Sequence, residues 1–119
     1  MTGPELIDRV IIDDLVEAIG ADGARSVIDL FVAEAQGYLA TIAAAAAPGA
    51  DPATRDQARR AAHSLKSGAG QIGAAAVAAA ATDVERAATS GAALTQPVAA
   101  LQQCAAETAA ALASLQKRE

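Results

Sequence analysis

Residues 94–115 read LTQPVAALQQCAAETAAALASL, and the mostly apolar positions of one face recur there in alternating steps of four and three. This spacing is typical of the seam along which helices pack in a bundle. A long coiled coil would show the same spacing, but short turns between runs of similar length favour antiparallel neighbours in a compact bundle. The positions are Leu94, Val98, Leu101, Ala105, Thr108, Leu112 and Leu115.

Glycine and proline residues divide the N-terminal part of the chain into two further helical runs. Pro4 can open and Gly20 can close a short helix over about residues 4–19. Asp22 is a candidate N-cap for a long run over about residues 23–47. One face of that run is apolar and predicts burial: Ile28, Phe31, Ala35, Tyr38, Ile42 and Ala45.

The middle of the chain carries a strong helix start signal. Asp51 can serve as an N-cap with Pro52 at the first helical position, and Gly73 permits a bend at the end of that run. The helices predicted from here on cover about residues 52–72, 74–89 and 95–117. A narrow apolar stripe runs along the first of them: Ala58, Ala62, Leu65, Ala69 and Ile72.

We therefore predict an all-α fold. Residues 23–117 are expected to form an antiparallel up-down four-helix bundle, with the short helix of residues 4–19 as a lid, in one domain of residues 1–119. The composition agrees, because 53% of the residues are hydrophobic, many of them alanine, and 2% are aromatic. Alanine is the best helix former, and β-branched and aromatic residues are scarce, which argues against a β-sandwich or a Rossmann fold.

Charge and cysteine content exclude several classes of function. The net charge of −5 and the pI near 4.7 argue against sequence-blind nucleic-acid binding, which needs a basic surface. One cysteine, Cys104, and one histidine, His63, are too few for an internal disulfide or a structural zinc site. Cys104 is interpreted as a small helix residue, and no metal or cofactor is expected on this chain.

The sequence shows no targeting segment. Acidic residues precede any basic residue at the N-terminus, without an apolar run behind them, and the uncharged stretch 87–106 contains proline, glycine and glutamine. We therefore expect a cytoplasmic protein without a membrane or nucleic-acid partner. A monomer is expected because the bundle can bury its own stripes, and Met1 with no linker at either end favours a free-standing domain.

His63 is the one side chain that titrates near neutral pH in its unperturbed state. It lies opposite the apolar stripe of its helix and is expected to face solvent. The positions around it are cationic or small: Arg59, Arg60, Lys66, Ser67 and Gly70. Cations would attract a phosphoryl group and favour the neutral, nucleophilic imidazole, while small neighbours would let another protein reach the ring.

Two glycines in this helix leave an alternative open. Gly68 and Gly70 each cost about 1 kcal/mol relative to alanine in a helix. Two residues of low helix propensity so close together in a predicted helix often mark a functional site. The alternative is that residues 68–73 form a loop, that the helix stops near Ser67, and that His63 is an ordinary surface residue.

Residues 62–74, AHSLKSGAGQIGA, resemble the signature of histidine-containing phosphotransfer (HPt) domains, in which His-x-Leu-Lys-Gly is followed by small residues and a later glycine. Residues 83–87, DVERA, resemble the Leu-Glu-x-Ala segment of the following helix in that family, and the similarity covers roughly the whole chain. The chain departs from the family at Ser67, where a glycine is usual, although the residue there is still small.

The resemblance implies a four-helix bundle that shuttles phosphoryl groups between receiver-domain aspartates and is not itself a kinase. His63 would be phosphorylated, Lys66 would contact the phosphoryl group, and Glu85 would lie near the imidazole. The small residues Ser67, Gly68 and Gly70 would let a receiver dock. The partners would be response-regulator receiver domains and a hybrid histidine kinase, with Mg²⁺ supplied by the receiver.

Several roles stay open at this level. Glu85 can fix the imidazole tautomer, pair with Lys66 or Arg86, or remain solvated. Arg55 and Arg59 can steer an acidic receiver or pair with Asp56 or Glu85. Competing functions are the phosphoacceptor module of a histidine kinase, disfavoured by Ser64 and the absence of a nearby proline after the histidine, and an alanine-rich helical adaptor with an inert histidine.

Overall fold

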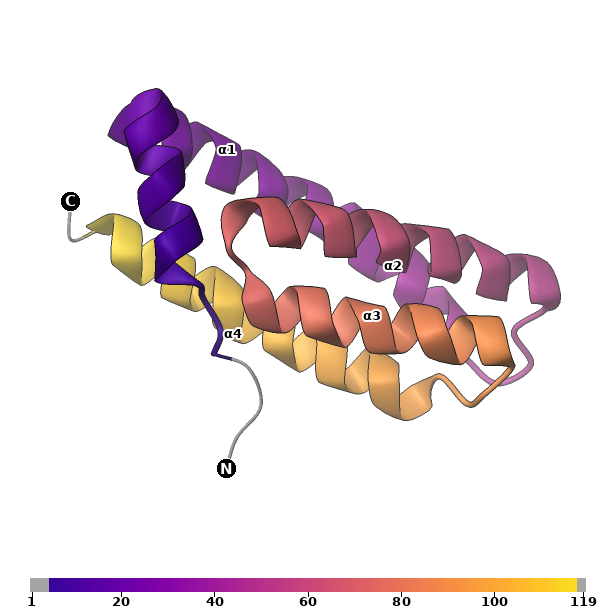
Figure 1. The fold of residues 1–119 in the computed structure, drawn as a ribbon. Helices are drawn as coiled ribbons and strands as arrows, with labels where there is room; N and C mark the ends of the chain where they lie inside the picture. Colours follow the sequence, from indigo (N-terminus) through magenta and orange to yellow (C-terminus); the bar gives the residue numbers. More distant parts are fainter. Residues whose placement is uncertain (1–4, 118–119) are drawn as a thin grey trace.

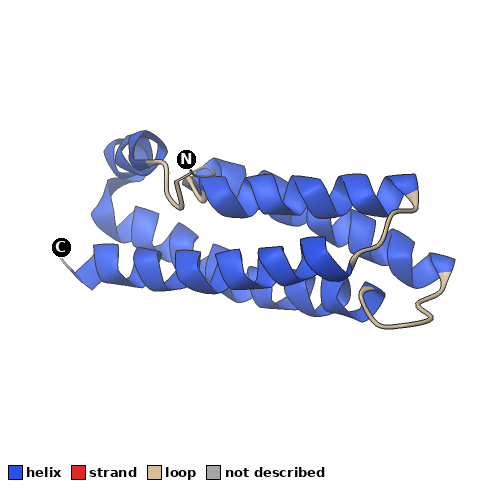
Figure 2. Cartoon of the chain, turned by 90° about the horizontal axis from the view of Figure 1, so that it is seen from below, coloured by secondary structure: helices blue, strands red, loops and turns tan. Residues whose placement is uncertain are grey.

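The computed structural model describes residues 5–117, and this part of the chain contains four helices and no strand. The helices run up and down beside one another with short loops between them (Figures 1 and 2). This arrangement confirms the predicted all-α four-helix bundle. The helices are α1 (Arg9–Ala45), α2 (Pro52–Ile72), α3 (Ala75–Ser90) and α4 (Thr95–Lys117).

A sharp kink at Gly20 divides α1 into two arms. Gly20 has φ 83° and ψ 166°, a combination that side-chain-bearing residues rarely adopt, so a glycine is needed there. The arm before Gly20 crosses the end of the bundle, and the arm after it joins the bundle (Figure 1). The predicted lid helix therefore exists, and Gly20 closes it as expected.

Three details predicted along α1 differ from the structure. The first arm begins at Arg9, where Asp8 accepts a hydrogen bond from the backbone N–H of Val10 at 3.0 Å; Pro4, the predicted start, lies outside the described residues. Asp22, the predicted N-cap of the second arm, lies inside the helix because the chain resumes helical geometry directly after Gly20. The second arm ends at Ala45, two residues before the predicted end.

The chain before the first arm is fastened to the turn between α2 and α3. The backbone N–H of Asp8 donates to the carbonyl oxygen of Gly73 at 2.7 Å, and the N–H of Ala76 donates to the carbonyl oxygen of Leu6 at 3.4 Å. The helix starts later than predicted because Asp8 caps it at Arg9, and the backbone at and before this cap is bonded to the turn. Gly73 has φ 82°, and a Cβ there would lie 2.8 Å from the Asp8 carbonyl oxygen.

The predicted apolar faces form the core. All five residues of the α2 stripe are buried, and five of the seven positions of the α4 series are buried while Ala105 and Leu115 are half-buried. The largest fully buried side chains are Ile42, Leu65, Leu101, Leu112, Val77, Val84 and Thr108. Phe31 and Tyr38 pack against this core from α1 as predicted, half-buried.

By length and composition alone, α1 is long and apolar enough to cross a membrane, with a mean hydropathy of 1.3 in its most apolar window. In the fold, Gly20 breaks this helix, and Ile28, Ala35 and Ile42 are buried in the bundle core. A core helix of a bundle passes the same test, so this finding establishes no membrane span.

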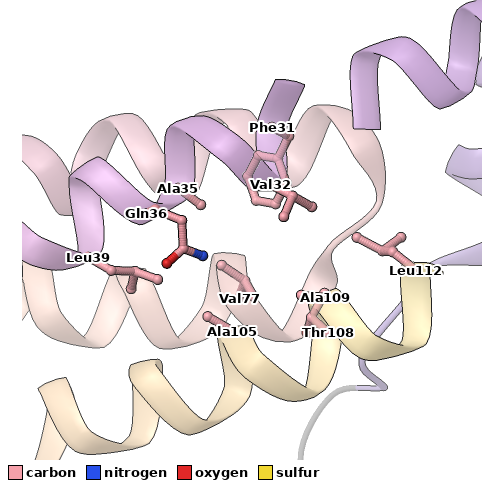
Figure 3. A pocket seen from close by; sticks show the side chains of 10 residues that line it. All are labelled: Phe31, Val32, Ala35, Gln36, Leu39, Val77, Ala105, Thr108, Ala109 and Leu112. Atoms are coloured by element: carbon pink, nitrogen blue, oxygen red, sulfur yellow. The ribbon is translucent and has the colours of Figure 1, made fainter. Parts of the chain in front are cut away.

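The seam between α1 and α4 is the loosest of the bundle. A narrow hollow of about 20 Å³ lies in it, lined by Phe31, Val32, Ala35, Gln36, Leu39, Val77, Ala105, Thr108, Ala109 and Leu112 (Figure 3). Thr108 is 1% exposed, and its hydroxyl has no hydrogen-bond partner among the described residues. No ionisable side chain lines this hollow, so it offers no acid–base chemistry.

Candidate functional site

The site is built on α2, whose start and end are fixed by its own sequence. The Asp51 carboxylate accepts a hydrogen bond from the backbone N–H of Thr54 at 2.8 Å, and Pro52 occupies the first turn. The helix then continues without a break to Ile72 and is closed by Gly73 in the left-handed conformation. The alternative of a loop over residues 68–73 is therefore wrong, and His63 lies well inside a rigid helix.

His63 points outward from α2, and its side chain is 59% exposed. Its Nδ1 atom lies 2.9 Å from Oε2 of Glu85 on α3, the helix that runs beside α2 in Figure 1. The other carboxylate oxygen of Glu85, Oε1, accepts a hydrogen bond from Nζ of Lys66 at 2.8 Å. One carboxylate thus holds both the imidazole and the nearest lysine.

The charge state of Glu85 decides the tautomer of His63. The hydrogen bond from Lys66, and then that from His63, holds the pKa of the Glu85 carboxyl below its ordinary value, against the effect of burial. Glu85 is therefore ionised at neutral pH and only accepts hydrogen bonds, so Nδ1 of His63 carries the proton. The lone pair of the neutral ring is then on Nε2, the atom that Glu85 does not occupy.

The two arginines predicted beside His63 have a carboxylate partner of their own. Asp56 accepts from Nε of Arg59 at 2.9 Å through one oxygen and from Nε of Arg60 at 3.1 Å through the other. The hydrogen bond from Arg59 is the largest cause that lowers the pKa of the Asp56 carboxyl. The sequence predicted a cationic surround for His63, whereas the structure pairs each of these cations with an acid.

The small residues after His63 fall into two groups. Ser67 and Gly70 are exposed, and nothing lies within 4 Å of the position that a Cβ on Gly70 would take. Gly68 instead faces α1, where an added Cβ would lie 3.4 Å from the Phe31 ring. Ser67 and Gly70 therefore leave the surface beside His63 open, whereas Gly68 serves the packing of α1 on α2.

The family comparison agrees with this geometry. Residues 26–117 match the family model of the Hpt domain. This chain belongs to the Hpt domain family. No curated protein and no solved structure matches the chain.

Membership in the family gives the Hpt domain its general activity, histidine phosphotransfer in phosphorelays of two-component signalling. Hpt domains carry phosphoryl groups and are not kinases, and they interact with receiver domains of response regulators and with kinases. The match begins within the second arm of α1, so the lid arm before Gly20 lies outside the matched residues.

Arg55 has a structural contact that sequence reasoning missed. Its Nη2 atom donates to the carbonyl oxygens of Ala87 at 3.3 Å and Ala92 at 2.9 Å, across the end of α3. The Ala87 carbonyl oxygen also accepts from the backbone N–H groups of Gly91 and Ala92, so the guanidinium adds a contact from α2 to the turn that closes α3. This Hpt domain therefore uses Arg55 to tie α2 to the end of α3, which leaves it a poor candidate for steering a receiver.

Two other chemistries find no support in the described residues. Residues 5–117 contain no group of three histidine, cysteine, aspartate or glutamate side chains that could hold a metal ion. Burial raises the pKa of the Cys104 thiol, which keeps it protonated and unreactive at neutral pH. Of the two carboxylates that the sequence left open as partners for Arg55 and Arg59, the structure pairs Asp56 with Arg59, and with Arg60 as well, at helical spacings of three and four.

Proposed function

We propose that this Hpt domain is a phosphorelay intermediate that accepts a phosphoryl group on Nε2 of His63 from a receiver-domain aspartate and passes it to a second receiver. The observation that carries the proposal is the bond between Nδ1 of His63 and Glu85 at 2.9 Å. That bond puts the proton on the inner nitrogen and leaves the outer one as a nucleophile on an exposed ring.

In the proposed transfer, Nε2 attacks the phosphorus of the receiver aspartyl phosphate in line. The bond between phosphorus and the aspartate oxygen breaks, and the aspartate leaves as a carboxylate. The proton on Nδ1 stays in place, and the ionised Glu85 stabilises the positive charge that the phosphorylated ring acquires. Return of the group to a second aspartate reverses these steps, with His63 as the leaving group.

Lys66 is proposed to contact the phosphoryl group. It is one turn from His63 on the same helix and is already held at Glu85 Oε1, 2.8 Å away, within the same cluster. Three ammonium hydrogens let Lys66 keep this bond while donating another to a phosphoryl oxygen. Its side chain is 34% exposed, so it is accessible from the face on which His63 lies.

The Hpt domain supplies only part of the reactive centre. We assign the divalent metal to the receiver, whose acidic pocket holds the aspartyl phosphate, and expect transfer only within the complex. Ser67 and Gly70 allow the approach because they present no bulk beside the ring. A soluble, cytoplasmic monomer is the form in which we expect the domain to meet its receivers.

The test is phosphoryl transfer from a panel of labelled receiver domains to the wild-type chain, with His63→Gln as the matched control. Glutamine preserves the polarity of an exposed position, so folding should be unchanged by circular dichroism. We expect label on the wild type alone, lost in acid and stable in base, as a phosphohistidine is. Equal labelling of both proteins, or no labelling of the folded wild type by any receiver, would favour a non-catalytic adaptor.

A further inference from the structure

The acidic partner of the two arginines beside His63 is Asp56, which has no part in the transfer described above. Its two carboxylate oxygens bind the Nε atoms of Arg59 and Arg60 at 2.9 and 3.1 Å. Among residues 5–117, neither guanidinium makes another side-chain hydrogen bond. Their terminal nitrogens are therefore available for a further acceptor.

The direction of helical side chains separates the arginines from the imidazole in this state. Side chains of an α-helix lean toward its N-terminus, so the His63 ring extends over the turn that carries Arg59 and Arg60. The arginine side chains lean away in the same direction, toward Asp56 one turn earlier. Asp56 thus holds the guanidinium groups of Arg59 and Arg60 near His63, and both side chains point away from its imidazole.

Of the two, Arg59 is better placed to reach the ring. It lines a hollow between α2 and α3 together with Arg55, Asp56, Ala88 and Thr89. Glu85, which holds the imidazole, lies one turn before Thr89 on α3. Arg60 has a side chain that is 73% exposed, against 37% for Arg59, and does not line this hollow.

Phosphorylation changes the balance of charge at this place. Before it, Lys66 is paired with Glu85 and the two arginines are paired with Asp56. A phosphoryl group adds about two negative charges near neutral pH. A guanidinium binds such a group through two parallel hydrogen bonds, whereas exposed pairs between aspartate and arginine are weak.

We propose that Asp56 is a positioning residue that binds Arg59 near His63 before phosphorylation. When His63 is phosphorylated, Arg59 leaves Asp56 and binds the phosphoryl group. This inference rests on the proposed function. The exchange makes Asp56 a competitor of the phosphoryl group for Arg59. It therefore limits how strongly the domain retains the group that it must hand on.

The experiment uses phosphoramidate, which can phosphorylate an exposed histidine without a receiver. Nε2 attacks phosphorus, the P–N bond of phosphoramidate breaks, and ammonia leaves with the bonding electrons, while Nδ1 keeps its proton. The readout is the pH midpoint of the ³¹P resonance of the phosphohistidine, because a guanidinium on the phosphoryl group favours its dianion. Four chains are compared: the wild type, Asp56→Asn, Arg59→Gln and the double variant.

We expect Arg59→Gln to raise the pH midpoint of the phosphohistidine. Asp56→Asn should lower it, because the phosphoryl group should bind its proton about two- to five-fold more weakly, roughly the effect of an exposed ion pair. In the double variant, most of the Asp56→Asn effect should vanish because Arg59 is absent. Asp83→Asn removes a charge from an exposed pair with Arg86 on α3 and serves as the charge-matched control. Its midpoint should equal that of the wild type.

Two results would overturn the inference. One is a midpoint that Arg59→Gln leaves unchanged, and the other is an Asp56→Asn shift of equal size with and without Arg59. Phosphorylation of His63 by phosphoramidate without transfer from any receiver would refute only the proposed function. If phosphoramidate leaves His63 unmodified, the phosphohistidine is formed from a labelled receiver and the same midpoints are measured; failure of both donors would refute both proposals.

Discussion

The seam between α2 and α3 and the seam between α1 and α4 use opposite means to close the same bundle. The first is closely packed and is crossed by polar contacts: Glu85 reaches His63 and Lys66, and Arg55 reaches the end of α3. The second is loose and lined mostly by alanine and other apolar residues, and the buried Thr108 hydroxyl has no hydrogen-bond partner within residues 5–117. The candidate site lies at the seam that side chains of both helices cross, and the hollow lies at the other seam.

The largest effect on the first seam is expected from Gly73→Ala. The left-handed φ of 82° and an Asp8 carbonyl oxygen at 2.8 Å from the new Cβ should together cost about 3 kcal/mol of unfolding free energy. Chemical denaturation measures this loss. Gly91→Ala is the matched control, because φ is 80° there and nothing lies within 4 Å of the new Cβ.

The control should lose only about 1–2 kcal/mol, the cost of the backbone conformation. Equal losses for the two variants would show that the segment containing Asp8 does not press on the turn between α2 and α3. The close packing of this seam would then involve α2 and α3 alone, without the segment that contains Asp8.

Glu85→Gln should have the next largest effect, on transfer. Glutamine can still accept from Nδ1 of His63, but it cannot balance the charge of the phosphorylated ring or of Lys66. We expect the rate of transfer to fall about tenfold, which corresponds to about 1.4 kcal/mol, the size of a hydrogen bond to a charged group. Single-turnover transfer from a receiver measures it, and an unchanged rate would reduce Glu85 to a packing residue.

The same variant should alter the response to acid. Because the pKa of the Glu85 carboxyl is lowered in the folded chain, its contribution to stability is present above its ordinary pKa of 4.5 and is lost as the pH falls through the lowered value. Glu85→Gln lacks this contribution. Its unfolding free energy should therefore fall less steeply below about pH 4.5 than that of the wild type.

Thr108→Val should have the smallest effect, and of opposite sign. Valine has nearly the shape of threonine, and it removes a hydroxyl that is buried without a partner among the described residues. We expect a gain of about 1 kcal/mol in unfolding free energy and no change in transfer. Thr82→Val is the control, because the Thr82 hydroxyl donates to the carbonyl oxygen of Ala78 at 2.8 Å and should lose stability when replaced.

A gain in transfer rate from Thr108→Val would contradict the contrast between the two seams, because it would show that the hollow between α1 and α4 influences the site between α2 and α3. A loss of stability would show that the hydroxyl is satisfied in solution. Either result is read from the same two measurements, denaturation and single-turnover transfer.

Local signals predicted the helices well. Asp51, Pro52 and Gly73 bound α2 in the structure as they do in the sequence, because an N-cap, a first-turn proline and a left-handed glycine act through neighbouring residues. The start of the lid also has a local signal, the N-cap Asp8, which the prediction of a start at Pro4 passed over, whereas the docking of the lid depends on a distant partner, the turn at Gly73. No periodicity in residues 1–20 contains that information.

The site residues also divide into those that local signals predicted and those whose contacts depend on the packing of distant segments. The exposure of His63 follows from the stripe of its own helix, and the pairing of Asp56 with its arginines is readable from spacing within α2. The contact of Glu85 with both His63 and Lys66 joins residues 22 and 19 positions apart and depends on the register of α3 against α2. Several partners were open for Glu85 in the sequence, and the structure selects two of them at once.

The fastening of residues 6–8 onto the turn between α2 and α3 also sets an order of events in folding. The hairpins α1–α2, α2–α3 and α3–α4 join neighbours along the chain, whereas the bond from Asp8 to Gly73 closes a loop of more than sixty residues. Contacts of such separation form late because loop closure must be completed first. The lid arm should therefore dock last, and its amides should exchange with solvent before those of the bundle do.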